Sequence, residues 1–297
     1  MSAHRGRFAP SPTGRLHFGS LVAALASWLD ARAAGGTWLV RMEDIDRDRE
    51  VPGAADGILA TLASFGLRSD KPVLRQSRRT SVYAEARDRL ERSGLAYRCW
   101  CSRSDLEPFA GVHPARCIAP ASQRPPAWRV RVGDAVVGFE DAIQGPQQQD
   151  LRREVGDFVI WRVEGGPAYQ LAVVVDDAAQ GITDVVRGAD LLDSTPRQIH
   201  LQRQLGLPQP RYAHVPLVLD AHGRKLSKHA AALAVDAGDP LPALRAALAF
   251  LGQEGVAGGT ADLLLEAAAR AFDLRRIPRS ATAPAAFAAP RNAAARS

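Results

Sequence analysis

The segment Arg7-Phe8-Ala9-Pro10-Ser11-Pro12-Thr13-Gly14-Arg15-Leu16-His17-Phe18-Gly19-Ser20 connects a short apolar stretch, residues 6–9, to an amphipathic stretch, residues 18–34. The first stretch predicts a strand, and the spacing of apolar residues in the second predicts a helix. In an open α/β sheet, ligands bind beyond the carboxyl ends of the strands, where helix N-termini offer free N–H groups to phosphates. We therefore predict a phosphate-binding loop; the alternative is a turn-rich connection with a solvent-exposed histidine.

Strand-like and helix-like patterns alternate along the rest of the chain. Strands are expected at residues 37–42, 73–75 and 214–219, and helices at 54–65, 82–92, 196–205, 241–251 and 261–272. Mixed helix and strand signals occur at residues 157–162, 169–177 and 182–187. Strands separated by helices predict an α/β fold with a parallel sheet and crossover helices.

The region from residue 97 to 149 differs, because it holds all three cysteines, six prolines and few helical runs. Strand-like pieces at 128–132 and 136–139 predict an insertion with its own small architecture. We divide the chain into five expected parts. They are the first half of a nucleotide-binding catalytic domain (5–96), the insertion (97–150), the second half of the catalytic domain (151–223), a helical C-terminal region with a lysine-containing loop (224–277) and a disordered tail (278–297).

The composition is that of a folded globular protein, since 46% of the 297 residues are hydrophobic and 24% are charged. The chain has no run of about 18 apolar residues and no apolar stretch at its start, so we expect neither a membrane span nor a secretory signal. Three cysteines in a chain of this length indicate a reducing, cytoplasmic setting. A net charge of +6 favours an anionic partner, nucleic acid first.

Lysine is rare, and two of the three lysines lie in the tetrapeptide Lys225-Leu226-Ser227-Lys228. Two ammonium groups on one loop suit a pyrophosphate leaving group, on which negative charge develops in the transition state. We therefore predict a nucleotide-binding role for this loop. The alternative is a solvated basic loop.

Four zinc-type ligands, Cys99, Cys101, His113 and Cys117, lie within nineteen residues. A Cys3His set suits a tetrahedral structural Zn²⁺. Four protein ligands leave no open position on the metal, so we do not expect a catalytic zinc. The alternative is three free thiols near a chance histidine.

Charged residues follow two predicted strands. Three carboxylates lie in the segment Arg41-Met42-Glu43-Asp44-Ile45-Asp46. They could hold a substrate ammonium group or, less directly, Mg²⁺. The alternative is an acidic loop before a helix, which is common. Arg187 ends a later apolar strand, where its planar guanidinium could grip a carboxylate. The alternative for Arg187 is an ordinary surface arginine.

The order and spacing of these motifs resemble the class I aminoacyl-tRNA synthetases of the glutamyl type. His17-Phe18-Gly19-Ser20 resembles their first signature, usually His-Ile-Gly-His. Lys225-Leu226-Ser227-Lys228-His229 resembles their second, Lys-Met-Ser-Lys-Ser, with Leu and His replacing Met and the last Ser. The resemblance runs from about residue 5 to about residue 272. It implies a Rossmann-type doubly wound parallel sheet with a zinc-containing insertion and a small helical C-terminal part.

Full glutamyl-tRNA synthetases carry a further helical anticodon-binding region, for which this chain has no room. A catalytic core with a Cys-x-Cys…His…Cys insertion resembles the glutamyl-queuosine tRNA(Asp) synthetases, whose fourth zinc ligand can be a tyrosine where His113 stands here. The resemblance implies one structural Zn²⁺ per chain, Mg²⁺ with ATP, and tRNA(Asp) containing queuosine as a partner. An enzyme that modifies an anticodon base needs no separate anticodon reader, which agrees with the short length.

The resemblance also implies residue roles. The glutamate pocket would comprise Arg7, Phe8, Ala9, Pro10, Ser11, Glu43, Tyr169 and Arg187. ATP would be held by His17, Gly19 and Lys228, and the catalytic residues would be His17, Lys225 and Lys228. Two arginines and one glutamate suit a substrate with two carboxylates and one ammonium, which Glu43 would take.

The implied reaction has two steps: glutamate and ATP form glutamyl-adenylate without tRNA, and the glutamyl group passes to a hydroxyl on the cyclopentene ring of queuosine. Positioning and electrostatics would carry this chemistry, with no protein nucleophile. One alternative is a truncated glutamyl-tRNA synthetase that charges the tRNA 3′ end. The other is a non-catalytic RNA-binding paralogue, which could lose Lys228, Glu43 or Arg187 freely. We expect a monomer by default.

Overall fold

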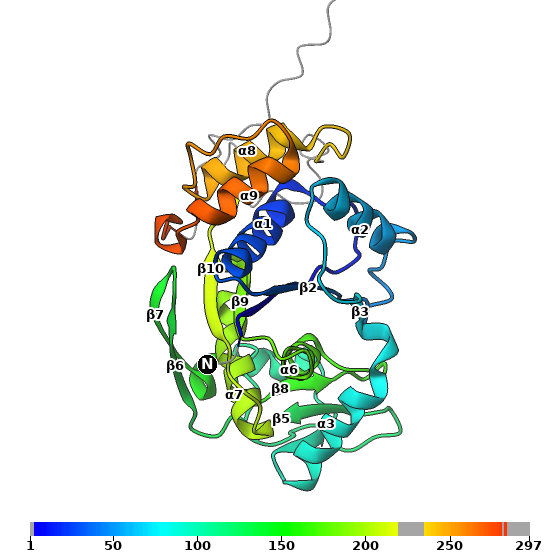
Figure 1. The fold of residues 1–297 in the computed structure, drawn as a ribbon. Helices are drawn as coiled ribbons and strands as arrows, with labels where there is room; N and C mark the ends of the chain where they lie inside the picture. Colours follow the sequence, from blue (N-terminus) through cyan, green and yellow to red (C-terminus); the bar gives the residue numbers. More distant parts are fainter. Residues whose placement is uncertain (1–2, 219–234, 281, 284–297) are drawn as a thin grey trace, which may run out of the picture.

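The computed structural model describes residues 3–218, 235–280 and 282–283. A parallel sheet lies at its centre (Figure 1), built from β1 (Arg5–Phe8), β2 (Thr37–Met42), β3 (Leu74–Arg75), β9 (Asp184–Gly188) and β10 (Arg211–Val215). Strand β2 pairs with β1 and β3, and β10 pairs with β9. The two halves meet where the Thr183 N–H donates to the Arg5 carbonyl, 3.0 Å away. The resulting order, β3-β2-β1-β9-β10, is that of a doubly wound Rossmann-type sheet and confirms the predicted fold class.

Helices cover both faces of this sheet. On one face α1 (Phe18–Ala33) packs against β1, β2 and β9, and it is covered in turn by α8 (Pro240–Phe250) and α9 (Ala261–Ala271) (Figure 1). The other face carries α3 (Thr80–Arg92), α6 (Tyr169–Ala179) and α7 (Thr195–Leu205), which pack on one another. The remaining helical segments are α2 (Ala54–Ser64), α4 (Arg103–Leu106), α5 (Leu151–Glu154) and the 3-10 turns η1 (Gln76–Arg78), η2 (Glu107–Phe109), η3 (Ala189–Ser194) and η5 (Leu274–Arg276).

Two hydrophobic clusters flank the sheet because its strands are buried on both faces. Trp38 and Val40 of β2 belong to the cluster around α1, whereas Leu39 belongs to the cluster around α6 and α7. In β9, Val186 and Val185 divide in the same way. This alternation follows from the two-residue period of a strand, and it explains why both strands read as continuous apolar runs.

Two antiparallel units accompany the parallel sheet, one as a separate sheet and one joined to its edge. Strands β4 (Ala96–Cys99), β5 (Ala127–Val130) and β8 (Phe158–Trp161) form a small sheet in the order β4-β5-β8. The hairpin β6 (Val136–Asp141) and β7 (Gly145–Asp150) joins the parallel sheet, since β6 pairs with β10 at Asp141 and Tyr212. Strands from the two sides of the predicted boundary at residue 150 therefore pair with each other, β5 with β8 and β6 with β10. The domain limits stay predictions.

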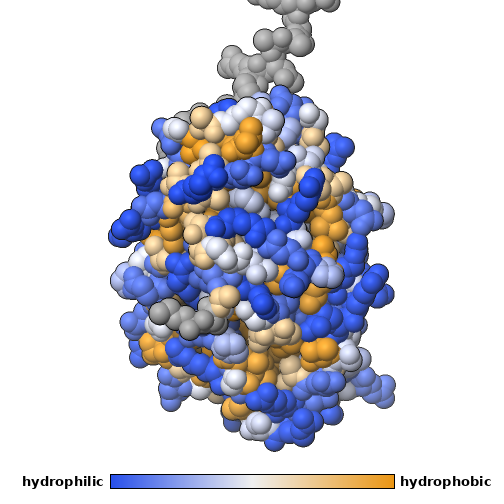
Figure 2. Space-filling model, in the orientation of Figure 1, coloured by the Kyte–Doolittle hydropathy of each residue, from blue (hydrophilic) through white to orange (hydrophobic). Residues whose placement is uncertain are grey.

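The C-terminal part is described only in pieces. Strand β11 (Leu217–Val218) pairs in parallel with β12 (Thr282–Ala283), which falls within the predicted tail. The lysine loop at 225–228 lies outside the described residues. Within the described residues no helix is both long and apolar enough to cross a membrane. The face in Figure 2 is mainly hydrophilic, with hydrophobic residues in separate patches.

Asp176 of α6 ties three segments of the fold together. Its buried carboxylate accepts hydrogen bonds from Gln76 Nε2 at 2.8 Å, Arg79 Nε at 2.8 Å and the Tyr83 hydroxyl at 2.7 Å. Burial, together with this carboxylate, raises the pKa of Tyr83, so the hydroxyl keeps its proton and donates it to Asp176. The contacts therefore fix η1 and α3 against α6.

Tyr83→Phe should lower the free energy of unfolding by about 1.5–3 kcal/mol, because it removes a hydrogen bond to a buried charged group. Tyr212→Phe is the matched control, since the buried Tyr212 hydroxyl accepts from the neutral Gln202 amide at 2.9 Å. Its cost should be about 0.5–1.5 kcal/mol. Urea titrations measure both values, and a Tyr83→Phe cost no larger than that of the control would contradict this role of Asp176.

Candidate active site

A cavity of about 800 Å³ opens at the carboxyl ends of β1 and β9. Its walls come from the loop after β1, the first turn of α1, the end of β2, and the segments after β9 and β10. Strands β1 and β9 are neighbours whose crossover connections leave in opposite directions. The cavity therefore lies at the switch point of the sheet, where ligands of doubly wound proteins bind.

The structure brings together at this cavity every predicted glutamate- or ATP-site residue that it describes. These are Arg7, Phe8, Ala9, Pro10, Ser11, His17, Gly19, Glu43, Tyr169 and Arg187. Lys225 and Lys228 lie outside the described residues. The shared location is a structural fact, whereas the individual roles stay predictions.

One carboxylate holds both Arg7, which lines the cavity, and Arg41, which is fully buried. Asp177 Oδ1 accepts from Arg7 Nε at 3.2 Å and from Arg41 Nη1 at 2.7 Å. Burial alone would raise the pKa of Asp177, but the two guanidinium groups hold that pKa below its ordinary value. Asp177 is therefore ionised and fixes both arginines from α6.

Glu43 places a buried carboxyl group in the cavity lining. Its Oε1 accepts from Arg41 Nη2 at 3.2 Å, which orients the carboxylate at the end of β2. Burial raises the pKa of Glu43, although Arg41 and Arg7 oppose the shift. Because burial disfavours the ionised carboxylate, a further cation beside Glu43 would stabilise its charged form. Tyr169, whose pKa burial also raises, lines the same wall with a protonated hydroxyl.

Arg187 is a buried arginine of the cavity that has no carboxylate partner among the described residues. Its Nε donates to His214 Nε2 at 3.0 Å, and its Nη2 donates to Thr195 Oγ1 at 2.8 Å and weakly to the Leu191 carbonyl at 3.3 Å. Its Nη1 is buried and has no hydrogen-bond partner in the described part of the chain. A substrate carboxylate in the cavity would supply both the missing acceptor and the missing negative charge.

His17 caps the N-terminus of α1 beside the same cavity. Its Nδ1 accepts from the Ser20 N–H at 3.2 Å, and its Nε2 lies 3.0 Å from Ser20 Oγ. Since Nδ1 accepts, Nε2 carries the proton. A Cβ at Gly19 would lie 3.4 Å from the His17 ring, so glycine lets the imidazole lie against the helix turn. Ser20, the variant position of the signature, thus orients His17.

Gln76 is a cavity residue that no sequence motif indicated. Its Nε2 donates to Asp176, and this orientation is fixed because a carboxylate only accepts. Gln76 Oε1 is consequently a buried acceptor without a partner among the described residues. Its position directly after β3, at the carboxyl end of a parallel strand, is the signal that could have identified it.

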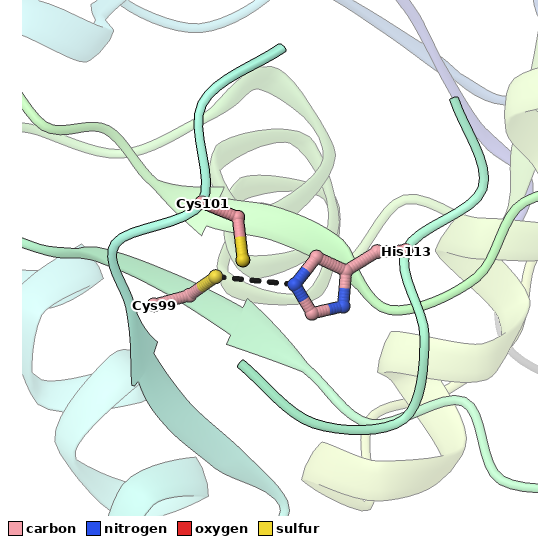
Figure 3. A group of neighbouring side chains, drawn as sticks. All are labelled: Cys99, Cys101 and His113. Atoms are coloured by element: carbon pink, nitrogen blue, oxygen red, sulfur yellow. Dashed lines mark hydrogen bonds between the residues drawn. The ribbon is translucent and has the colours of Figure 1, made fainter. Parts of the chain in front are cut away.

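A second cluster lies in the insertion, away from the cavity lining. Cys99, Cys101 and His113 place their ligand atoms within 4.8 Å of one another (Figure 3). Cys99 Sγ lies 3.1 Å from His113 Nε2, and Cys117 Sγ lies 3.7 Å from Cys101 Sγ. The structure therefore gathers the four predicted ligands into one possible metal site.

The surroundings of this cluster suit a metal. His113 Nδ1 contacts the Tyr97 hydroxyl at 3.2 Å, and that hydroxyl donates to Asp157 at 2.8 Å. Burial raises the pKa of Cys99 to about 12, so a thiolate there requires a cation beside it. A histidine whose second nitrogen is held by a polar chain is the usual arrangement at a zinc site.

The charged residues that line the cavity favour a particular kind of ligand. Buried guanidinium groups of Arg7 and Arg187 and the carboxylate of Glu43 complement a small amino acid with two carboxylates. The N-terminus of α1, capped by His17, adds an adjacent site for phosphate. Activation of a carboxylate by a nucleotide needs these two sites side by side.

Comparison with known proteins identifies the family. The model of the class I tRNA synthetases (E and Q), catalytic domain, matches residues 4–114 and 119–263. The chain is 60% identical over 278 residues to the glutamyl-Q tRNA(Asp) synthetase of Xanthomonas axonopodis pv. citri (strain 306), covering 92% of each chain. It is 56% identical to the protein of that name from Burkholderia cenocepacia (strain HI2424), covering 93% of this chain and 98% of the relative.

A solved structure shares the fold. The glutamate tRNA ligase from Elizabethkingia meningosepticum CCUG26117, in complex with its amino acid, matches with a TM-score of 0.78 and 25% identity. The match covers 94% of this chain but 66% of that ligase, so this chain spans slightly less than two thirds of it. The chain belongs to the class I tRNA synthetases for E and Q, in the family of the glutamyl-Q tRNA(Asp) synthetases.

Proposed function

We propose that this protein activates glutamate with ATP in the absence of tRNA and transfers the glutamyl group to the queuosine base of tRNA(Asp). The observation that carries the proposal is one cavity in which Arg187 and Glu43 face a space beside the N-terminus of α1. The acceptor follows from the high identity to glutamyl-Q tRNA(Asp) synthetases over nearly the whole chain.

In this proposal the cavity residues hold glutamate. Glu43 accepts from the substrate ammonium, and Gln76, whose Oε1 has no hydrogen-bond partner among the described residues, supplies a second acceptor. Arg187 and Arg7 hold the carboxylates. Ala9 and Ser11 shape the loop around the substrate, and Tyr169 lines the same cavity.

Activation is a displacement at phosphorus. A glutamate carboxylate oxygen attacks the α-phosphorus of ATP, the bond to the β-phosphate oxygen breaks, and pyrophosphate leaves. In this scheme the Nε2–H of His17 turns from Ser20 Oγ to a phosphate oxygen, and Gly19 permits the close approach of the nucleotide. Lys225 and Lys228 are assigned to the pyrophosphate from their sequence alone, and Mg²⁺ accompanies the nucleotide.

Transfer consumes the adenylate. A hydroxyl oxygen of the queuosine cyclopentene ring attacks the activated carbonyl, AMP leaves, and the hydroxyl proton passes to the leaving phosphate or to water. No side chain forms a covalent intermediate in this scheme, so the cavity acts by positioning and by electrostatics. The monomeric state and the cytoplasmic setting stay predictions from the sequence.

Arg187→Ala should raise the glutamate KM about a hundredfold, because it removes the buried donor of a carboxylate contact. The ATP KM should change less than about twofold, since the nucleotide binds beside α1. Glutamate-dependent ATP–pyrophosphate exchange without tRNA measures both constants. Arg275→Ala, at an exposed ion pair with Asp273, is the matched control. An unchanged glutamate KM in Arg187→Ala would remove Arg187 from the pocket.

We also propose a structural zinc ion held by Cys99, Cys101, His113 and Cys117. The convergence of these ligand atoms and the Tyr97–Asp157 chain behind His113 support it. Zinc at this position would join the strand β4 to the loop that carries His113, in a segment with little regular structure. It would take no part in the reaction.

Protein purified under reducing conditions should contain about one zinc per chain, because the site offers four protein ligands. His113→Ala should lower the zinc content and the melting temperature, since it removes a ligand. His200→Gln, a buried histidine of α7 outside the cluster, should keep the zinc. Elemental analysis gives the stoichiometry, and reduced wild-type protein without zinc would favour free thiols.

A further inference from the structure

A buried histidine and a buried aspartate stand behind Arg187. His214 of β10 and Asp141 at the end of β6 are 0% and 1% exposed. His214 Nδ1 lies 2.6 Å from Asp141 Oδ2, and His214 Nε2 accepts from Arg187 Nε at 3.0 Å. The three side chains form a continuous chain from the hairpin β6–β7 to the cavity.

The hydrogen bonds fix the tautomer of His214. Arg187 Nε always carries a proton, so His214 Nε2 must be an acceptor. The proton therefore lies on Nδ1 and is donated to Asp141. Burial lowers the pKa of His214, and Arg187 lowers it further against the opposing effect of Asp141, so the ring is neutral as this arrangement requires.

Asp141 is itself held in one orientation. Its Oδ1 accepts from the N–H groups of Ile143 at 3.0 Å, Gln144 at 2.8 Å and His214 at 3.1 Å. Burial would raise the pKa of Asp141, but the contact with His214 and the backbone donors hold it below its ordinary value. Asp141 is thus an ionised acceptor that leaves Oδ2 to His214.

We propose that Asp141 and His214 are positioning residues for the substrate carboxylate, acting through Arg187. Asp141 selects the tautomer of His214, His214 binds Arg187 Nε, and Thr195 binds Nη2. These contacts leave Nη1 as the guanidinium nitrogen without a hydrogen-bond partner among the described residues, and Arg187 lines the cavity. The inference rests on the proposed function, because the carboxylate is that of glutamate.

The arrangement differs from an ordinary buried ion pair. A carboxylate in direct contact with Arg187 would neutralise it and compete with the substrate. The neutral imidazole orients the guanidinium without cancelling its charge. Tyr212 stacks on the His214 ring at a centroid distance of 6.3 Å and lies 5.5 Å from the Arg187 guanidinium, which limits movement of both.

Asp141→Asn tests the chain with little change in shape. The Asn oxygen can keep the three backbone hydrogen bonds, but its amide group then donates to His214 Nδ1. The proton must move to Nε2, which opposes the Arg187 Nε–H donor. The glutamate KM in tRNA-independent exchange should rise about 10- to 100-fold, while the ATP KM changes less than about twofold. An unchanged glutamate KM would overturn the proposal.

Nitrogen-15 NMR of histidine tests the tautomer independently of activity. Wild-type His214, assigned by the loss of its signal in His214→Gln, should be the Nδ1–H tautomer, and Asp141→Asn should convert it to Nε2–H. His200→Gln is the control for exchange kinetics and should keep the wild-type glutamate KM. A wild-type His214 protonated at Nε2 would overturn the proposal, even if Asp141→Asn failed to fold. Wild-type protein without exchange activity would instead contradict the proposed function.

Discussion

The buried positive charge of Arg187 is the constraint on which the site depends. Its hydrogen-bond partners in the described part of the chain are all neutral: an imidazole, a hydroxyl and a carbonyl oxygen. By contrast, Arg7 and Arg41 share the charge of Asp177. An unpaired buried charge costs several kcal/mol, so the folded protein keeps a site that a carboxylate ligand would stabilise.

The fold supplies this constraint through its topology. Strands β1, β2 and β9 end at one edge of the sheet, and each delivers a charged residue there: Arg7, Arg41 with Glu43, and Arg187. Helix α6 provides Asp176 and Asp177 from the side of the sheet that carries α3 and α7. The charges are therefore fixed by strand ends and one helix, and loop movement is not needed to assemble them.

Local patterns allowed much of this to be predicted from the sequence. The apolar run of β2 was predicted at its observed bounds, Thr37–Met42, because a strand buried on both faces leaves a continuous hydrophobic signature. The Cys and His spacing likewise predicted a cluster that the structure brings together. The apolar stretches on either side of the first loop predicted that His17 precedes a helix, and it lies at the N-terminus of α1.

Non-local contacts could not be predicted in this way. The pairing of β6 with β10 joins Asp141 to Tyr212 across 71 positions, and no local pattern encodes that register. The strand β7, with the sequence Gly145–Asp150, is rich in glutamine and carries no hydrophobic alternation. Gln76, Asp141 and His214 belong to no motif, and their importance comes only from what the fold places beside them.

The most direct test of the function is transfer of labelled glutamate to tRNA in the presence of ATP and Mg²⁺. Bulk tRNA from cells that make queuosine would be compared with bulk tRNA from cells that cannot make it. The account predicts label only on the queuosine-containing tRNA, with glutamate on the modified base. Equal label on both would mean charging of the 3′ end, and label on neither would contradict an enzyme of this kind.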